Sequence, residues 1–96
     1  MPIASPRYAF SRTMVSGAPP DPGVFALWEG EELIYYGRAQ SIHAQLQEHL
    51  EGTERCTRRA THYGWEIRSN PAAREAALLS EFRRAHGRLP RCNAAA

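Results

Sequence analysis

Two short apolar segments separated by a tight turn constrain the fold of this chain more than any other feature. Residues 23–28 read Gly-Val-Phe-Ala-Leu-Trp, a composition that is typical of a buried strand. Residues 29–31, Glu-Gly-Glu, predict a turn, and residues 33–36, Leu-Ile-Tyr-Tyr, predict a second strand that ends at Gly37. Because turn and strand chemistry agree, the two segments predict a β-hairpin.

Helical spacing begins after this hairpin. Ser41 is a typical helix N-cap, and Ile42, Leu46 and Leu50 follow at intervals of four residues, which place them on one side of a helix. Gly52 is a typical helix stop. The sequence therefore predicts a first helix between Ser41 and Gly52.

A third strand and a second helix follow. Residues 60–68 alternate aromatic or apolar side chains with more polar ones, the pattern of a half-buried strand. Asn70 and Pro71 then predict a helix start, with asparagine at the cap and proline in the first turn, and Gly87 predicts its end. The predicted order is strand, strand, helix, strand, helix. This order favours an α+β fold in which helices flank a small three-stranded antiparallel sheet.

The length and composition indicate one folded domain. A chain of 96 residues has room for a single modest core. Five of the seven prolines lie in residues 1–22, so residues 1–20 are expected to form a partly ordered N-terminal extension and residues 21–96 the domain. No apolar run approaches the roughly 18 residues of a membrane span, and the N-terminus lacks an export signal pattern. We therefore expect no membrane association and a cytoplasmic location.

The two cysteines predict no structural metal site. Cys56 and Cys92 are too few and too far apart in sequence for a four-ligand zinc site. In a reducing cytosol they are expected to be free thiols.

Positive charge is concentrated in the C-terminal half of the chain. All 12 basic residues are arginine. Residues 1–54 carry a net charge of −4 from three arginines and seven acidic residues, and residues 55–96 carry +6 from nine arginines and three glutamates. Coding bias explains the lack of lysine most simply, but guanidinium groups also bind phosphate with two parallel hydrogen bonds. The asymmetry moderately favours contact with nucleic acid.

Three segments together resemble one family. Residues 22–25, Pro-Gly-Val-Phe, are similar to the Pro-Gly-Val-Tyr opening of GIY-YIG nuclease domains, and residues 34–39, Ile-Tyr-Tyr-Gly-Arg-Ala, are similar to their second motif. Residues 81–93, from Glu81 through Leu-Pro-Arg-Cys to Asn93, resemble the end of the nuclease domain of the bacterial excision-repair incision subunit, and of small stand-alone bacterial members. Each motif alone is weak, but their order on the expected elements is specific. The resemblance covers about residues 20–93 and implies a DNA endonuclease fold.

The resemblance implies roles for four residues. Glu81 corresponds to the glutamate that holds the divalent metal, so Mg²⁺ or Mn²⁺ is the implied cofactor. Tyr35 corresponds to the second-motif tyrosine, whose hydroxyl contacts the nucleophile or phosphate; alternatively, it is a strand aromatic that packs on the sheet. Asn93 corresponds to an asparagine that orders the site. His49 corresponds to a histidine that homing endonucleases carry one turn after their catalytic arginine, whereas Glu75 is expected at the surface.

Two departures from the family pattern weaken the expected chemistry. The first-motif tyrosine, proposed in the family as the general base, is Phe25 here, which has no proton to exchange. The catalytic arginine of the first helix is Gln45, which brings no positive charge to the developing phosphorane. His49 lies four residues after Gln45 and therefore on the same side of the helix. Arg38 is a candidate substitute cation.

Three functions stay open. The favoured one is a DNA-binding domain with weakened or lost endonuclease activity. The alternatives are an active metal-dependent endonuclease with a reorganised site, in which His49 is a candidate base, and a scaffold for a protein partner. The arginines expected to contact nucleic acid are Arg38, Arg58, Arg59, Arg83, Arg84 and Arg91.

Overall fold

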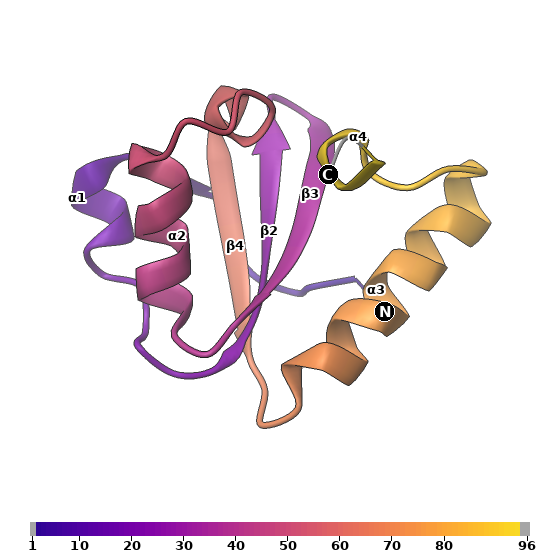
Figure 1. Ribbon diagram of the computed structural model, residues 1–96, viewed down its shortest axis with the longest axis horizontal. Coiled ribbons are helices and arrows are strands. Elements are labelled where there is room, and N and C mark those ends of the chain that lie inside the picture. Colours follow the sequence, from indigo (N-terminus) through magenta and orange to yellow (C-terminus); the bar gives the residue numbers. More distant parts are fainter. Residues whose placement is uncertain (1, 95–96) are drawn as a thin grey trace.

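A four-stranded antiparallel sheet forms the centre of the protein (Figure 1) in the computed structural model, which describes residues 2–94. Its strands are β1 (Tyr8–Ala9), β2 (Gly23–Glu29), β3 (Glu32–Ala39) and β4 (His62–Ile67), in the spatial order β1-β4-β2-β3. The prediction of an α+β fold is confirmed, but the prediction of a three-stranded sheet was wrong, because the sheet has four strands. The fourth, β1, is only two residues long, and it lies in the proline-rich segment that gave no strand pattern.

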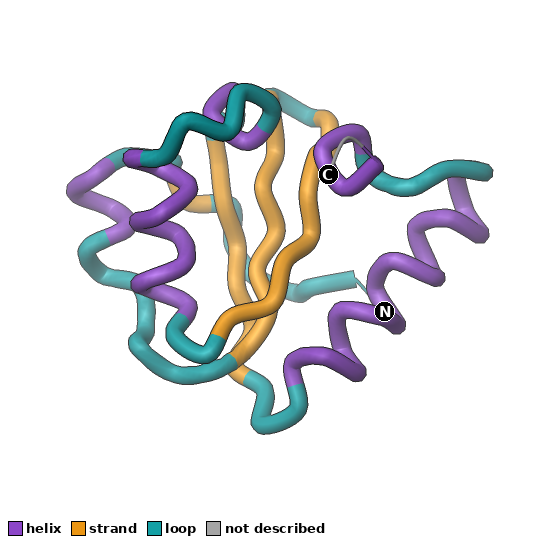
Figure 2. The backbone as a smooth tube through the Cα atoms, in the orientation of Figure 1, coloured by secondary structure: helices purple, strands orange, loops and turns teal. Residues whose placement is uncertain are grey.

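The helices cover both faces of this sheet. They are α1 (Arg12–Val15), α2 (Ile42–Glu51), α3 (Pro71–His86) and α4 (Arg91–Ala94), with a 3₁₀ turn, η1 (Thr57–Arg59), between α2 and β4. The helices α1 and α2 lie on one side of the sheet and α3 on the other, while α4 lies beside β3 (Figures 1 and 2). The strand β3 is therefore an edge strand with a long helix on each of its two faces.

The predicted hairpin is confirmed as β2 and β3, joined at Gly30, whose φ of 59° suits glycine. Its register contains one irregularity: Leu27 pairs with Tyr35, but Trp28 pairs with Leu33, so β3 carries one extra residue. Beyond it, successive side chains alternate between the two faces. Tyr35 consequently faces α2, and its neighbour Tyr36 faces α3.

Both predicted helices are present. The hydroxyl of Ser41 accepts a hydrogen bond from the backbone N–H of Ala44 (3.2 Å) and so caps α2. In the described chain, Asn70 occupies the N-cap position of α3 without a side-chain capping bond, and Pro71 supplies the first turn. Gly87 ends α3 in the left-handed region with a φ of 73°.

Each face of the sheet has its own core. On the α2 face, Phe25, Leu27, Ile42 and Leu46 are completely buried, and on the α3 face the buried set comprises Ile3, Val24, Ala26, Trp28, Tyr36 and Leu78. The N-terminal residues take part, because Val15 and Ala18 are buried with the first set and Ile3 with the second. The expected extension is thus packed onto the domain over its described residues.

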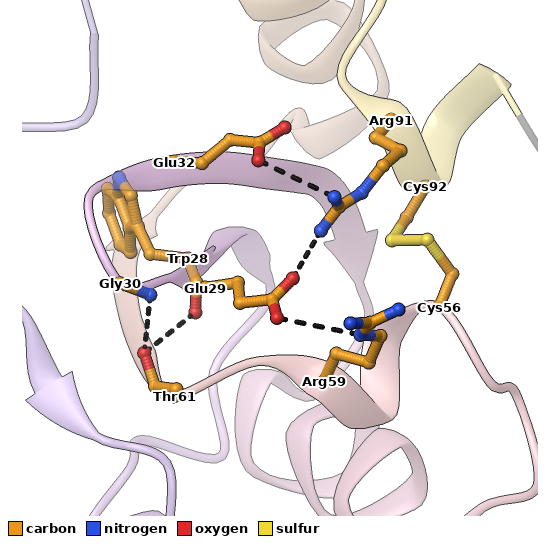
Figure 3. A network of polar contacts seen from close by, with 9 residues as sticks. All are labelled: Trp28, Glu29, Gly30, Glu32, Cys56, Arg59, Thr61, Arg91 and Cys92. Carbon is orange, nitrogen blue, oxygen red and sulfur yellow. Dashed lines mark hydrogen bonds and ion pairs between the residues drawn. A yellow bond between two sulfur atoms is a disulfide. The ribbon is translucent and has the colours of Figure 1, made fainter.

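A disulfide corrects the expectation of free thiols. Cys56, in the loop before η1, is bonded to Cys92 in α4, 36 residues further along the chain. The fold brings these two segments together at the hairpin end of the sheet (Figure 3), a proximity that their separation in sequence conceals.

Ion pairs reinforce the same corner of the molecule. The carboxylate of Glu29 contacts the guanidinium groups of both Arg59 (3.5 Å) and Arg91 (Figure 3). Arg91 also lies 3.5 Å from Glu32. The four-residue helix α4, too short to be stable alone, is therefore held by the disulfide and by ion pairs to the hairpin.

Among residues 2–94, no helix is both long and apolar enough to cross a membrane.

Candidate functional site

Three rings from three elements form a cluster on the α2 face. The centroids of Tyr35 and His49 are 5.3 Å apart, those of Phe25 and His49 5.5 Å, and those of Phe25 and Tyr35 5.9 Å. Phe25 is completely buried, whereas Tyr35 and His49 are half-buried. The fold thus brings together three residues that the sequence singled out for the site.

Two glycines allow close packing, Gly37 at this cluster and Gly23 between β2 and β4. A Cβ atom on Gly37 would lie 2.5 Å from Cζ of Phe25 and 2.8 Å from Cε2 of Tyr35. A Cβ atom on Gly23 would lie 2.2 Å from the carbonyl oxygen of Glu66 on β4. Both motif glycines are therefore required for close packing rather than for an unusual backbone conformation.

The imidazole of His49 has a defined partner. Its Nδ1 lies 3.2 Å from Oγ1 of Thr57, whose side chain is almost fully buried. Burial lowers the pKa of His49 below its ordinary value, against the opposing effect of the charges on Glu48 and Glu54. The ring is therefore neutral at neutral pH and can accept a proton.

Arg38 and Gln45 line one hollow of about 570 Å³. The hollow lies where the end of β3, the first half of α2 and the N-terminus of α3 meet, and residues 69–72 complete its wall. The two residues that the sequence considered as phosphate contacts therefore meet around the edge strand.

Glu75, on α3, lies near two of the residues that the sequence singled out, Arg38 and Tyr35. Its carboxylate is half-buried and lies 3.9 Å from Nε of Arg38. Burial raises the pKa of the Tyr35 hydroxyl, and the negative charge of Glu75 raises it further, ahead of Glu54. Glu75 is therefore partly exposed, with its carboxylate near Arg38 and close enough to Tyr35 for its charge to act on that hydroxyl.

Strand pairing explains this placement. Gly23 pairs with both Ala39 and Ile67, so the end of β3 and the end of β4 lie at the same end of the sheet. The helix α3 begins four residues after β4 and therefore starts beside the end of β3. A residue early in α3, such as Glu75, must then lie near Arg38.

Glu81 lies elsewhere on the same helix. It lies six positions after Glu75, which is about 9 Å along the helix axis and about one and two-thirds turns around it. Glu81 lines a second hollow of about 570 Å³ with Trp28, Tyr36 and Phe82, on the α3 face. Its charge raises the pKa of Tyr36, after the larger effect of burial, whereas that of Tyr35 responds to Glu75.

Asn93 acts on the backbone of β3. Its side-chain Oδ1 accepts a hydrogen bond from the N–H of Tyr36, and its Nδ2 donates one to the carbonyl of Tyr36, both at 2.9 Å. The amide thus pairs with the outer edge of β3 one residue after Tyr35. This geometry orders the strand rather than contacting the ring cluster.

The six candidate arginines differ in their surroundings. Arg59 and Arg91 are paired with Glu29, and Arg38 with Glu75. The others are exposed: Arg58 on η1, and Arg83 and Arg84 on α3.

A divalent metal would have few protein ligands here. Residues 2–94 contain no cluster of three or more histidine, cysteine, aspartate or glutamate side chains suited to a metal ion. Magnesium retains several waters and is commonly held by one or two carboxylates. The half-buried carboxylate of Glu75, which lies 3.9 Å from Nε of exposed Arg38, is of that ligand type.

Comparisons with known proteins identify the fold. The chain matches no protein-family model and no curated protein. It is similar to the solved GIY-YIG N-terminal endonuclease domain of UvrC from Thermotoga maritima bound to its catalytic divalent cation, magnesium, with 24% identity and a TM-score of 0.68 over 84% of this chain and 92% of that one. Two point mutants of that domain, also bound to the catalytic divalent cation, match with 23% identity and a TM-score of 0.68, and with 22% and 0.67. They cover 84% of this chain and 92% and 91% of their own. The chain therefore has the GIY-YIG nuclease-domain fold.

Proposed function

We propose that this protein binds DNA beside β3, the edge strand of the sheet, and cleaves phosphodiester bonds slowly with a divalent metal. The observation that carries this proposal is that Tyr35, which contacts His49, and Arg38, which pairs with Glu75, lie three residues apart on β3 of a GIY-YIG fold. The solved neighbours are endonuclease domains with a catalytic divalent cation, which supports this reaction class.

DNA binding rests on the arginines. Arg38 is exposed beside the hollow at the end of β3, and Arg58, Arg83 and Arg84 are exposed on neighbouring elements. Each can contact a phosphate, so affinity is expected to fall steeply with salt as counterions are released. Arg59 and Arg91 are assigned instead to the ion pairs around Glu29.

Glu75 is the proposed metal ligand, in place of Glu81. It is the α3 carboxylate that acts on Tyr35, and its partner Arg38 can turn toward a bound phosphate and release it. When bound, the metal would polarise the scissile phosphate and stabilise the developing charge on the leaving oxygen. Tyr35 would hold the nucleophile or a phosphate oxygen by its hydroxyl, which stays protonated because its pKa is raised.

Phe25 and Gln45 account for slow cleavage. Phe25 places an apolar ring where the family has a tyrosine hydroxyl, and loss of a general base typically costs about 10²- to 10⁴-fold. Gln45 can donate a hydrogen bond to phosphate but supplies no charge. Both substitutions reduce the rate without removing the groups that bind DNA.

The decisive experiment compares two variants, Glu75→Gln and Glu81→Gln. Supercoiled, single-stranded and branched DNA are incubated with each protein in Mg²⁺, Mn²⁺ or chelator, and nicking is followed over hours. Wild type and Glu81→Gln are expected to nick in the metal lanes, and Glu75→Gln to lose about 10²-fold or more. All three should retain DNA in a gel-shift assay.

Other outcomes assign the remaining functions. DNA retention without nicking in any lane would show a binding domain that has lost catalysis. If only Glu81→Gln loses nicking, Glu81 and not Glu75 is the metal ligand. If the protein neither retains DNA nor nicks it, the remaining function is a scaffold for a protein partner.

A further inference from the structure

We propose that Thr57 is a positioning residue that holds His49 with its proton on Nδ1, so that Nε2 serves as the proton acceptor in place of the hydroxyl missing at Phe25. This inference rests on the proposed cleavage, because it names the group that accepts the proton in that reaction. The tautomer of His49 can also be measured directly, without any cleavage of DNA.

The geometry begins with a buried hydroxyl. Thr57 is 1% exposed, so water cannot satisfy its side chain. Its Oγ1 has two neighbours, the carbonyl oxygen of Glu54 at 3.4 Å and Nδ1 of His49 at 3.2 Å. A carbonyl can only accept a hydrogen bond, so the hydroxyl proton is directed to Glu54.

This direction fixes the proton on the imidazole. A hydroxyl that donates to Glu54 presents its lone pairs to His49, and Nδ1 must then carry the proton. Both the donor and the acceptor capacity of the buried hydroxyl are used in this arrangement. The opposite one, with Thr57 donating to Nδ1, would leave the lone pairs of Oγ1 without a donor in a dry site. The carbonyl of Glu54 also accepts the N–H of Arg58 (3.1 Å), which keeps this loop folded around the hydroxyl.

The remaining nitrogen is then a base. With Nδ1 protonated, Nε2 of the neutral ring carries a lone pair. The ring lies against both Phe25, the residue that stands where the family has its first-motif tyrosine, and Tyr35. In the proposed reaction, Nε2 takes a proton from a water molecule as the water oxygen bonds to phosphorus. The bond from phosphorus to the leaving oxygen breaks, and solvent protonates that oxygen, which yields a phosphate monoester end and a hydroxyl end.

Burial favours the neutral state of His49 against the charged groups around it. Tyr35 faces it from β3, Glu54 from the loop before η1, and Glu48 from its own helix. Burial outweighs the two carboxylates and keeps the ring neutral near neutral pH.

Nitrogen-15 NMR of histidine-labelled protein tests the tautomer directly. The His49 signals are assigned with a His49→Gln variant, and the wild type should show a protonated Nδ1 and an unprotonated Nε2 at pH above the His49 transition. Thr57→Ser should keep this pattern. Thr57→Val, which removes the hydroxyl at constant volume, should give a mixture or the Nε2–H form, the tautomer that free histidine prefers.

Cleavage assays on the same variants test the consequence. Thr57→Val should lower nicking roughly tenfold, less than the loss of about 10² expected for His49→Gln, and Thr57→Ser should restore it. Thr61→Val is the matched control, because the Thr61 hydroxyl likewise lies between a backbone carbonyl, that of Trp28, and an imidazole Nδ1, that of His62 at 2.9 Å, and it also accepts the N–H of Gly30. Nicking by the wild type should fall at low pH as Nε2 becomes protonated, and His49→Gln should abolish that dependence.

Two results would overturn the inference. A wild-type spectrum with the proton on Nε2 would do so even if Thr57→Val failed to fold, and so would an Nδ1–H tautomer that persists unchanged in Thr57→Val. If instead the tautomer depends on Thr57 and no protein nicks DNA, the positioning role stands and the proposed cleavage fails.

Discussion

The two faces of the sheet differ in how firmly they are closed. On the α2 face, Phe25 is completely buried beside Tyr35 and His49, and the disulfide fastens this core to the C-terminal segment. On the α3 face, Leu78 is the residue of α3 that is buried, and Phe82 meets Tyr36 only edge-on at 6.5 Å.

The difference shows how one step along a strand separates two sites. Tyr35 and Tyr36 are neighbours in sequence, yet one faces a ring cluster and the other faces Phe82. Their carboxylate partners separate in the same way, with Glu75 acting on Tyr35 and Glu81 on Tyr36. Identical residue types thus belong to different surroundings, and the more completely buried α2 face is the one that holds the rings of Phe25, Tyr35 and His49 together.

Breaking the disulfide should have the largest effect on this contrast. A bond that closes a loop of 36 residues restricts the unfolded chain and stabilises the fold by about 4 kcal/mol. Urea unfolding of the oxidised protein and of a Cys56→Ala, Cys92→Ala variant should differ by roughly this amount. A difference near zero would mean that the ion pairs of Glu29 alone hold α4, and that the α2 face is no firmer than the other.

Removing the hydroxyl of Tyr35 or of Tyr36, in separate variants, tests by nicking activity which face of the sheet carries the catalytic groups. Tyr35→Phe should reduce metal-dependent nicking by about 10²-fold, the usual cost of losing one donor that is aimed at a developing charge. Tyr36→Phe should leave nicking unchanged, because the Tyr36 hydroxyl belongs to the hollow that Glu81 lines. Equal losses in both variants would contradict the separation of the faces.

Closing the space beside Phe25 should destabilise the α2 face. Gly37→Ala places a Cβ atom 2.5 Å from Cζ of Phe25, so the buried ring must move, at a cost of about 1–3 kcal/mol in the free energy of unfolding. Gly17→Ala is the control, since its Cβ would meet only the carbonyl oxygen of Met14 at an ordinary 3.5 Å. Similar unfolding midpoints for the two variants would show that the ring cluster is loosely packed.

The sequence predicted what depends on neighbouring residues. The hairpin at Gly30 and the start of α2 at Ser41 follow from turn and capping chemistry, and both are confirmed. The disulfide, the strand β1 and the placement of Glu75 depend on contacts between segments far apart in the chain. One signal for Glu75 was present, because α3 follows β4 so closely that its first turns must lie beside the end of β3.

The smallest expected effect is the dependence of stability on pH. A buried neutral histidine should make the protein less stable as the pH falls. The folded pKa of His49 is below its ordinary value of 6.5, so between the two pKa values the unfolded chain binds more protons. Stability is therefore fully present above pH 6.5 and is lost as the pH falls toward the folded pKa. Urea midpoints measured from pH 7.5 down to 5 should decline in wild type and decline less in His49→Gln. A decline of the same size in both would place the titrating group elsewhere, and His49 would then be as accessible to water as a residue on the open face.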